Sequence, residues 1–433
     1  MPKRVLIITY YWPPAGGAGV QRWLKFVKYL PGFGWDPVVY TAENGEFPVL
    51  DHSLEKDIPP GTTIIRKKIF EPYLFYKKFI GQKPEEKISA GFLSQSDKPP
   101  QKEKIARWIR GNLFIPDARK FWIRPSIRFL TKYLQENPVD VMVSTGPPHS
   151  MHLIGLGLKK KLNIPWITDF RDPWTNIDFY DELQLTKRAD KKHRRLEEKV
   201  LRSADAVVAV TRSMQEEFAG KGAKNTFFIP NGYDPDDFTE QAPVNPKKFR
   251  IVYIGSINPA RNPEVLWHVL KELTKDPAFA EELEILLIGK TDISVRKSLK
   301  EKDLEKYTVL QDYLPHEDIF RVEREAAVLL LLINRTSNAK GIITGKIFEY
   351  LTSGRPVLSI GPPDGEAARI LEETNTGTTV APDDQEALKK TILNLFAAYK
   401  KGLLMTEPRN LEKFSRKTLT QKMTAVFSGC LKK

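Results

Sequence analysis

Strand, loop and helix patterns alternate along this chain of 433 residues, and the alternation begins twice. In the first series, an apolar run at 4–9 leads through a glycine-rich loop into a segment with helical spacing at 19–30. In the second series, a similar run at 250–256 carries a glycine and is followed by a helical pattern at 262–273. Strands that alternate with helices form parallel sheets. The sequence therefore predicts two doubly wound α/β domains.

A polar stretch with several prolines, at 231–249, separates the two series and predicts a linker. We expect an N-terminal domain at 1–240, a C-terminal domain at 241–407, and a basic helical tail at 408–433 that can cross back to the N-terminal domain. Open parallel sheets bind ligands outside the carboxyl ends of their strands. Two such domains in tandem are therefore expected to face each other across a ligand-binding cleft.

Cysteine content and the lengths of apolar runs exclude several classes of protein. The single cysteine, Cys430, excludes an internal disulfide framework and a cysteine-based zinc cluster. The longest nearly pure apolar run, at 326–333, is far shorter than the ~20 residues that cross a bilayer. The first residues read as a strand that ends at two prolines, not as a signal peptide. We therefore expect a cytoplasmic protein with no structural metal.

The net charge of +14 is concentrated in a basic, aromatic insert at about 60–135 in the N-terminal domain. Trp108, Phe121 and Trp122 stand among lysines and arginines in this insert. Three interpretations are open: a solvated helix face over core aromatics, a surface for an anionic membrane, and a nucleic-acid surface. Nucleic acid is the least favoured of the three, and we do not expect it as a partner.

The glycine-rich loop at 16–19 leaves a choice between a dinucleotide site, an anion site and a tight turn. Gly17 and Gly19 fit the first two positions of the dinucleotide fingerprint G-x-G-x-x-G, but Arg22 replaces its third glycine. This replacement counts against a nicotinamide-dependent enzyme. Glycines at the start of a helix leave backbone N–H groups open to an anion. Gly17 and Gly19 are therefore candidate phosphate ligands, with a simple turn as the alternative.

A second glycine-punctuated loop, at 338–345, precedes a short helix and a buried strand. Thr344 can cap this helix, and Gly345 and Lys346 place bare N–H groups and a cation at its positive end. An anion at this end is stabilised by both. Glu349, one turn further on, can accept hydrogen bonds from vicinal sugar hydroxyls. A P-loop is excluded, because its G-x-x-x-x-G-K-[ST] spacing is absent.

These motifs resemble those of the GT-B glycosyltransferases of the retaining family 4 type, also called glycosyl transferases group 1. The matching stretches are spread over nearly the whole chain: PPAGGAGVQR at 13–22, ITDFRDPW at 167–174, IPNGYDPDDF at 229–238, VYIGSINPARNPEVL at 252–266 and KIFEYLTSGRPVLS at 346–359. The basic insert is the part that the resemblance covers least. The resemblance implies a GT-B architecture, in which two Rossmann-like domains face each other across a cleft.

For the donor site, the resemblance implies a nucleotide-diphosphate sugar, linked to UDP or GDP. Positive charge and helix-start N–H groups would bind the diphosphate, and these are assigned to Gly17, Gly19, Arg261, Thr344, Gly345 and Lys346. Glu349 is assigned to the ribose of the nucleotide. Because cations can stabilise the leaving diphosphate, neither a cofactor nor a metal ligand is expected.

The chain departs from the family pattern on the donor side and on the acceptor side. The first of two family glutamates falls on Gly341, and Ser256 stands where the family has a phosphate-binding arginine. Where the family often has His-Asp, this chain has Arg and Asp, so no catalytic histidine transfers to that position. The candidates for catalysis are Arg171, Asp172 and the nearby His149, and the candidate acceptor ligand is Asp169. Purely structural roles for His149 and for an Asp–Arg pair are the alternatives.

The expected function is that of a retaining, metal-independent glycosyltransferase of the hexosyltransferase type. Its acceptor would be a glycan or a lipid-linked glycan in bacterial cell-surface polysaccharide synthesis. The basic insert could then hold the protein peripherally at the inner face of the cytoplasmic membrane. A sugar-nucleotide epimerase of the same fold, or a non-catalytic module that binds nucleic acid or membrane, are the alternatives.

Overall fold

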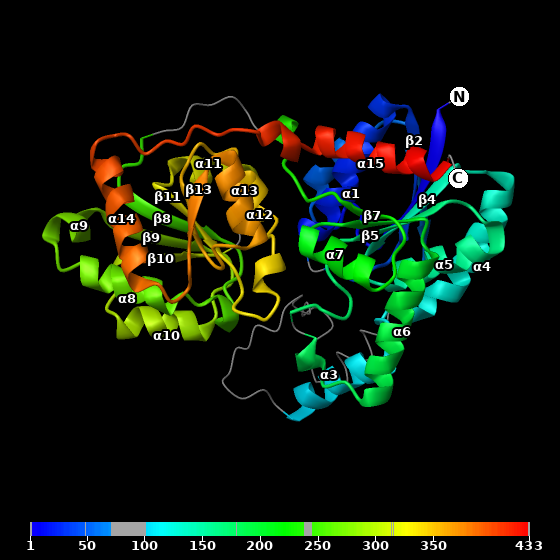
Figure 1. The fold of residues 1–433 in the computed structure, drawn as a ribbon, viewed down its shortest axis with the longest axis horizontal. Helices are drawn as coiled ribbons and strands as arrows, with labels where there is room; N and C mark the ends of the chain where they lie inside the picture. Colours follow the sequence, from blue (N-terminus) through cyan, green and yellow to red (C-terminus); the bar gives the residue numbers. More distant parts are fainter. Residues whose placement is uncertain are drawn as a thin grey trace. The chain divides into compact units, whose positions relative to one another are not determined.

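The computed structural model describes residues 2–47, 49–70, 101–178, 180–237, 245–312, 314 and 316–431. These residues form two compact units. The first unit holds the described residues up to Asn231 and those from Arg416 onward, and the second holds Gly232–Ser415. The first unit thus ends earlier than the expected boundary at 240, at the beginning of the polar stretch. Figure 1 shows the two units, each built around its own sheet.

The first unit contains a parallel sheet whose seven described strands follow the order β3-β2-β1-β4-β5-β6-β7. All of its strand pairs are parallel. Its central strands are almost continuously apolar because both faces of the sheet are covered by helices. The strands are β1 (Lys3–Ile8), β2 (Trp35–Ala42), β3 (Thr63–Lys67), β4 (Val141–Gly146), β5 (Trp166–Phe170), β6 (Ala206–Ala209) and β7 (Thr226–Phe228).

Helices cover both faces of this sheet, and each face has its own apolar core. One face packs against α4 (Lys120–Glu136), α5 (Ser150–Leu162), α6 (Lys187–Ser203) and α7 (Arg212–Gly220). The other face packs against α1 (Ala18–Tyr29) and α15 (Arg416–Leu431). The last helix of the chain therefore completes the core of the first unit. A further helix, α3 (Gln101–Leu113), contacts α6.

The second unit repeats this plan with six described strands in the order β10-β9-β8-β11-β12-β13. All of these pairs are parallel as well. The strands are β8 (Phe249–Ile254), β9 (Leu283–Ile288), β10 (Thr308–Gln311), β11 (Val328–Leu332), β12 (Val357–Ile360) and β13 (Gly377–Val380). The two parallel sheets confirm the predicted pair of Rossmann-like α/β domains.

The helices of the second unit also divide between two apolar cores. One core includes side chains of α8 (Glu264–Leu273), α9 (Pro277–Glu282), α10 (Ile293–Glu301) and α14 (Gln385–Lys400). The other includes side chains of α11 (His316–Glu325), α12 (Lys346–Tyr350) and α13 (Glu366–Thr374). Figure 1 shows α8, α10 and α14 on one side of the sheet and α11, α12 and α13 on the other.

Two elements differ from the expectation for the basic insert at 60–135. Its first part contributes β3, which pairs in register with β2 as an edge strand of the sheet. Its last part contributes α4, which packs on α5 and buries Trp122 and Leu130. These segments are therefore integral parts of the first unit. The stretch between them, 71–100, lies outside the described residues.

The tail also differs in detail from the single helix expected at 408–433. A short 3-10 turn at Leu411–Phe414 comes first, and α15 follows it.

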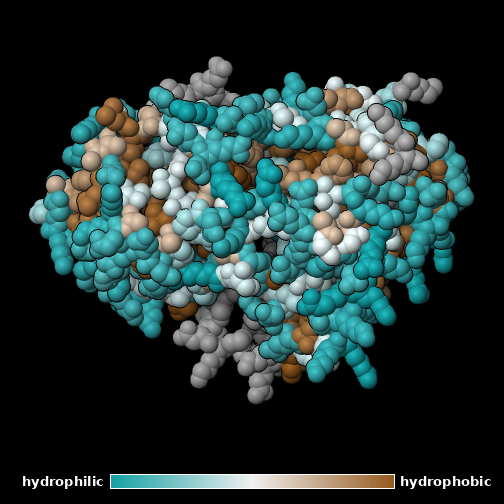
Figure 2. All heavy atoms as spheres, viewed as in Figure 1, coloured by the Kyte–Doolittle hydropathy of each residue, from teal (hydrophilic) through white to brown (hydrophobic). Residues whose placement is uncertain are grey.

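The face seen in Figure 2 is largely hydrophilic, with apolar residues in small patches. Among the described helices, none has both the length and the apolarity needed to cross a membrane.

Candidate active site

Two cations that lie far apart in the sequence meet at the carboxyl end of β8. Lys346, the first residue of α12, places its ammonium 3.3 Å from the Tyr253 hydroxyl and 4.5 Å from the ring centre. Arg261 belongs to the turn Pro259–Arg261, and its guanidinium also interacts with that hydroxyl. Arg261 Nε donates to Asn334 Oδ1, which fixes the guanidinium. The two predicted diphosphate ligands, Arg261 and Lys346, therefore both interact with the Tyr253 hydroxyl.

The pKa of Tyr253 indicates a positive potential at this point. Its side chain is buried, and burial alone raises the pKa of a phenol. Lys346 and Arg261 outweigh burial, so the pKa of Tyr253 lies below its ordinary value. A negatively charged group is therefore favoured here, as a diphosphate would be. Sequence reasoning missed Tyr253, because it reads only as one more apolar residue of β8.

Two glycines shape the strand ends beside Lys346. Gly255 has a φ of +116°, and a Cβ added there would lie 2.1 Å from Lys346 Nζ. Gly289, at the end of β9, has a φ of +109°, and its Cβ would lie 2.8 Å from the Gly255 carbonyl oxygen. Both positions combine the left-handed conformation with close approach, which only glycine tolerates. Gly255 thus leaves room for the ammonium group, and Gly289 leaves room for the Gly255 backbone.

The start of α12 differs from the expectation. The N-cap residue is Gly345, with no side-chain capping bond, so Thr344 does not cap the helix. The Thr344 hydroxyl is buried and has no hydrogen-bond partner among the described residues. The backbone carbonyl of Thr344 instead accepts from the Ile347 N–H at 3.2 Å. The reason is that Gly345 already has helical dihedral angles, which moves the first turn by one residue.

Glu349 lies on α12 three residues after Lys346 and is half-buried. Residues three apart share one face of a helix, so the carboxylate and the ammonium stand on neighbouring positions. The helix thus places the predicted ribose ligand next to one of the predicted diphosphate ligands, Lys346.

The glycine loop of the first unit also has a defined geometry. Gly17 is the N-cap of α1 and has a φ of +88°, which requires glycine. Gly16, by contrast, donates its N–H to the Val49 carbonyl at 2.9 Å, so this N–H is not available to an anion. A Cβ on Gly19 would lie 3.1 Å from Arg171 Nη1. Gly17 and Gly19 therefore remain candidate ligands.

Arg171 ties this loop to the turn between β4 and α5. One terminal nitrogen of its guanidinium donates to the Gly19 carbonyl at 2.6 Å, and the other donates to the Pro147 carbonyl. Its guanidinium also lies 5.6 Å from the centre of the Tyr11 ring. These contacts give Arg171 a role in holding the loop. Asp172, the next residue, is exposed and remains a candidate for ligand contact.

Asp169 occupies a different environment from the one expected for an acceptor ligand. It is fully buried at the end of β5, and Arg22, Trp23 Nε1 and Thr145 Oγ1 all donate to its carboxylate. Burial opposes ionisation, but these donors lower the pKa of Asp169 below its ordinary value. No oxygen of Asp169 is exposed to an acceptor hydroxyl. We therefore correct the expectation and assign Asp169 a structural role.

His149 is also buried, at the N-terminus of α5. Its ring stacks on Trp174 with centroids 4.6 Å apart and planes 1° apart. Burial, followed by the charges of His152 and His193, lowers the pKa of His149 well below its usual range. His149 is therefore uncharged at neutral pH. Its Nδ1 has no hydrogen-bond partner among the described residues.

Asp117 holds the residue that follows this histidine, and sequence reasoning missed it. The Asp117 carboxylate accepts from the Ser150 N–H and from the Ser150 hydroxyl, both at 2.8 Å. It thereby caps α5 at the residue after His149. Asp117 lies within the basic insert, where a single acid has no distinguishing pattern.

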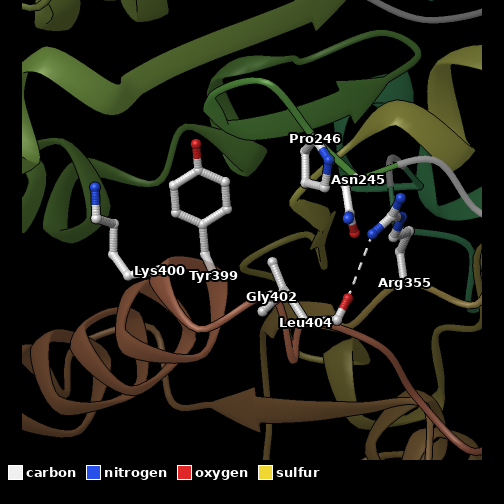
Figure 3. Close-up of a pocket in the computed structure, with 7 residues that line it drawn as sticks. All are labelled: Asn245, Pro246, Arg355, Tyr399, Lys400, Gly402 and Leu404. Carbon is white, nitrogen blue, oxygen red and sulfur yellow. Dashed lines mark hydrogen bonds between the residues drawn. The ribbon is translucent and has the colours of Figure 1, made fainter.

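A separate pocket of about 290 Å³ lies in the second unit (Figure 3). Arg355 Nη1 donates there to the Leu404 carbonyl at 3.4 Å. Arg355 precedes β12 and Asn245 precedes β8, so the pocket lies at the amino ends of the strands, away from Lys346. The residues that line it are Asn245, Pro246, Arg355, Tyr399, Lys400, Gly402 and Leu404.

Two family models match the chain. Residues 88–237 match the model "Glycosyltransferase Family 4", and residues 248–398 match "Glycosyl transferases group 1". Together the two matches cover more than half of the chain and include parts of both units. A sequence search of curated proteins finds no match.

Solved structures with similar folds cover nearly the whole chain. Sucrose-phosphate synthase from Thermosynechococcus elongatus has 16% identity and a TM-score of 0.61, over 99% of this chain and 98% of that one. HepE from Anabaena, in complex with UDP-glucose, has 14% identity and a TM-score of 0.60, over 98% and 99%. A putative UDP-N-acetylglucosamine 2-epimerase from Listeria monocytogenes has 12% identity and a TM-score of 0.57, over 99% and 96%. At these identities the likeness shows the fold, which is of the GT-B type.

Proposed function

The chain belongs to the group 1 glycosyltransferases, and from this premise we propose that it transfers a sugar from a nucleoside-diphosphate sugar to a glycan or lipid-linked acceptor. The observation that carries the donor site is the meeting of Lys346 and Arg261 at Tyr253. In a parallel sheet this position, at the carboxyl end of β8, is where ligands bind.

The reaction places its main electrostatic demand on the leaving group. As the glycosidic bond breaks, the nucleoside diphosphate gains negative charge. Fixed cations aimed at that charge stabilise the transition state more than the ground state. Lys346 and Arg261 supply such cations, each held by contacts to neighbouring side chains. On this ground we propose a reaction that needs no metal ion.

Glu349 is the proposed ligand of the ribose. It stands beside Lys346 on α12, as the ribose stands beside the diphosphate in a nucleotide. A carboxylate can accept two hydrogen bonds from a vicinal diol. The proposed donor is linked to UDP or to GDP, because contacts to the diphosphate and the ribose do not distinguish uracil from guanine.

On the acceptor side, Asp172 is the proposed contact of an acceptor hydroxyl because it is exposed beside the loop that Arg171 holds. Retention of configuration, with the leaving phosphate accepting the acceptor proton, is what the family resemblance implies. His149 is uncharged and buried behind this region, so its proposed part is to shape the site.

An exposed aromatic group in the first unit supports a contact with anionic membranes. Phe121 is 45% exposed and lies against Phe70 and Phe114, with the Lys120 ammonium 4.9 Å from its ring centre. Aromatic rings and lysines together suit the headgroup region of an anionic bilayer. We propose that this group brings the enzyme to a lipid-linked acceptor in bacterial cell-surface polysaccharide synthesis.

The membrane proposal is tested with vesicles of phosphatidylglycerol and phosphatidylcholine at low salt. Phe121→Ser should weaken binding to the anionic vesicles, whereas Phe227→Ser, a change of an exposed aromatic on β7, should not. Equal binding by all three proteins would overturn the proposal.

The transfer reaction is tested by titrating UDP- and GDP-sugars against wild type and Lys346→Ala, followed by product analysis. Loss of donor binding in the variant supports the donor site. The Listeria structure with a similar fold is titled a putative epimerase, so the products decide between transfer and epimerisation. Release of UDP or GDP with a glycosylated acceptor supports transfer, and a changed sugar nucleotide without an acceptor supports epimerisation.

A further inference from the structure

One side of α6 carries a row of cations. Of the 17 residues of this helix, eight are lysine or arginine and three are acids. Five of the cations recur at alternating steps of four and three residues, so they lie on one side of the helix along about 21 Å. All five are exposed, and we call them the α6 row: Arg188, Lys192, Arg195, Lys199 and Arg202.

The packing of α6 turns this row towards the solvent. The side of the helix that faces the rest of the unit is formed by buried residues, which are Ala189, His193, Glu197, Val200 and Leu201. The α6 row lies on the other side, away from the sheet. Packing of the core therefore does not account for the concentration of positive charge.

Few acids neutralise the α6 row. Within the part of the chain that the structure describes, Arg202 is the only one of the five with an ion pair, at 4.0 Å to Glu198. Asp190, another acid of the helix, pairs instead with Arg194, which lies outside the row. Like charges three or four positions apart repel each other and destabilise a helix. The row therefore suits a partner that presents many negative charges.

The neighbouring helix α5 extends the positive surface. It packs against α6, and Lys160 and Lys161 near its end are exposed. An interaction with the Lys199 side chain lowers the pKa of Lys160, as expected for two ammonium groups that lie close together. The positive surface therefore includes residues of two helices.

Exposed apolar side chains adjoin the α6 row. Figure 1 shows α3 beside α6, and the two helices are in contact. On α3, Ile105, Trp108 and Leu113 are 50%, 40% and 55% exposed. The Leu113 carbonyl accepts from Lys120 Nζ at 2.6 Å, which joins α3 to the aromatic group around Phe121.

This combination favours an anionic membrane over a nucleic acid. Lysines and arginines are attracted to anionic headgroups, and aromatic and aliphatic side chains enter the boundary between headgroups and acyl chains. A nucleic acid would engage the cations but would leave aliphatic side chains such as Ile105 and Leu113 in water.

We propose that the α6 row is the electrostatic part of a membrane-docking surface. It binds the headgroups of anionic phospholipids, while the apolar side chains of α3 and the aromatic group around Phe121 enter the bilayer surface. This inference deepens the membrane contact of the proposed function and rests on it. It makes α6 the helix that lies along the membrane.

The experiment is sedimentation of the full chain with phosphatidylglycerol and phosphatidylcholine vesicles at low salt. A cation near an anionic surface contributes about fivefold in affinity, so Lys192→Gln combined with Lys199→Gln should bind about 25-fold more weakly than wild type. The matched control combines Arg194→Gln, on another side of α6, with Lys297→Gln, an exposed position on α10. It removes the same charge and should change affinity by about threefold or less, because distant charges are screened.

Salt and lipid composition provide a second readout. At about 0.5 M salt, screening should remove the advantage of wild type over the variant with both row substitutions. Vesicles of phosphatidylcholine alone should also show no difference between the two proteins. A difference that persists under both conditions would contradict an electrostatic role.

The outcomes separate this inference from the proposed function. If wild type binds anionic vesicles and the variant with both row substitutions binds as tightly, the role of the α6 row is overturned while the membrane contact stands. If wild type binds no anionic vesicle, the membrane contact fails and this inference fails with it. Tighter binding to a duplex oligonucleotide than to the vesicles, lost in the same variant, would assign the row to nucleic acid and overturn the proposal. Thermal unfolding of each variant shows whether a loss of binding reflects a loss of fold.

Discussion

Arg22 and Asp169 form a buried ion pair, with Arg22 Nη2 2.8 Å from Asp169 Oδ1 and side-chain exposures of 1% and 0%. The same guanidinium donates to the Ile229 and Pro230 carbonyls, both at 2.8 Å. The pair therefore joins α1, β5 and the last residues before the first unit ends. Arg22, which interrupts the dinucleotide fingerprint, thus has a structural reason to be there.

Removing one partner of this pair should destabilise the first unit strongly. Asp169→Ala leaves a buried arginine without its counter-charge, and such a loss costs about 3–5 kcal/mol. Denaturation in urea measures the free energy of unfolding. Asp172→Ala, at an exposed neighbouring position, should change that free energy by about 0.5 kcal/mol or less. A similar effect of both substitutions would contradict the structural role of Asp169.

Loss of either cation at Tyr253 should slow the chemical step. We expect Lys346→Ala and Arg261→Ala each to lower turnover by about 10²–10³, as for the loss of one donor to a developing negative charge. Lys340→Ala is the control, because Lys340 is exposed and pairs with Asp364 instead. Steady-state release of UDP or GDP measures the effect. Wild-type turnover in both variants would remove the assignment of the diphosphate site.

Gly255→Ala should act through Lys346. The added methyl group collides with the ammonium, so turnover should fall nearly as far as in Lys346→Ala. In a double variant with Lys346→Ala, the change at Gly255 should cost little further turnover, because the collision is gone. The positive φ still strains alanine by about 1–3 kcal/mol. Full additivity of the two substitutions in turnover would show that Gly255 acts by another route.

Glu349→Ala should weaken nucleotide binding while the fold is retained. Hydrogen bonds to a charged group contribute about 1.5–3 kcal/mol, which corresponds to an affinity change of about tenfold to a hundredfold. Glu349→Gln should lose less, because an amide oxygen can still accept. Titration with UDP and GDP gives the dissociation constants. Unchanged constants in the alanine variant would rule out the ribose contact.

Buried histidines should make the first unit sensitive to acid. Burial lowers the pKa of His152 to about 3, whereas an unfolded histidine titrates near 6.5. Between these values the unfolded state binds more protons, so stability is lost as pH falls from 6.5 towards 3. His152→Gln should therefore lose less stability than wild type between pH 7 and pH 5. Urea denaturation at the two pH values measures the difference, and parallel losses would contradict the assignment.

The sequence was sufficient for the sheets but not for every site residue. Parallel strands such as β11 are buried on both faces, so their apolar runs stand out. The edge strand β3 was not recognised, because it is mostly half-buried or exposed and lacks such a run. The two candidate ligand loops could be predicted from glycine spacing, because glycine tolerates backbone conformations that other residues do not.

Asp169 and Asp172 show what cannot be predicted from the local sequence. Both follow the apolar part of β5, and nothing in the sequence separates them. Their difference comes from Arg22, 147 positions earlier in the chain, which approaches only one of them. Tyr253 was missed for the same reason, since it acts through partners that the fold brings near. Such roles depend on tertiary contacts and have no short-range signal.

The last helix has a consequence for engineering. The chain leaves the first unit after Asn231 and rejoins it at Arg416, and the Tyr233 N–H donates to the Phe414 carbonyl at 3.1 Å. The departing and returning segments thus run side by side, so the second unit is an insertion with adjoining ends. A short peptide that joins residue 231 to residue 416 should therefore replace the second unit. In the shortened protein, α15 should still complete the core of the first unit.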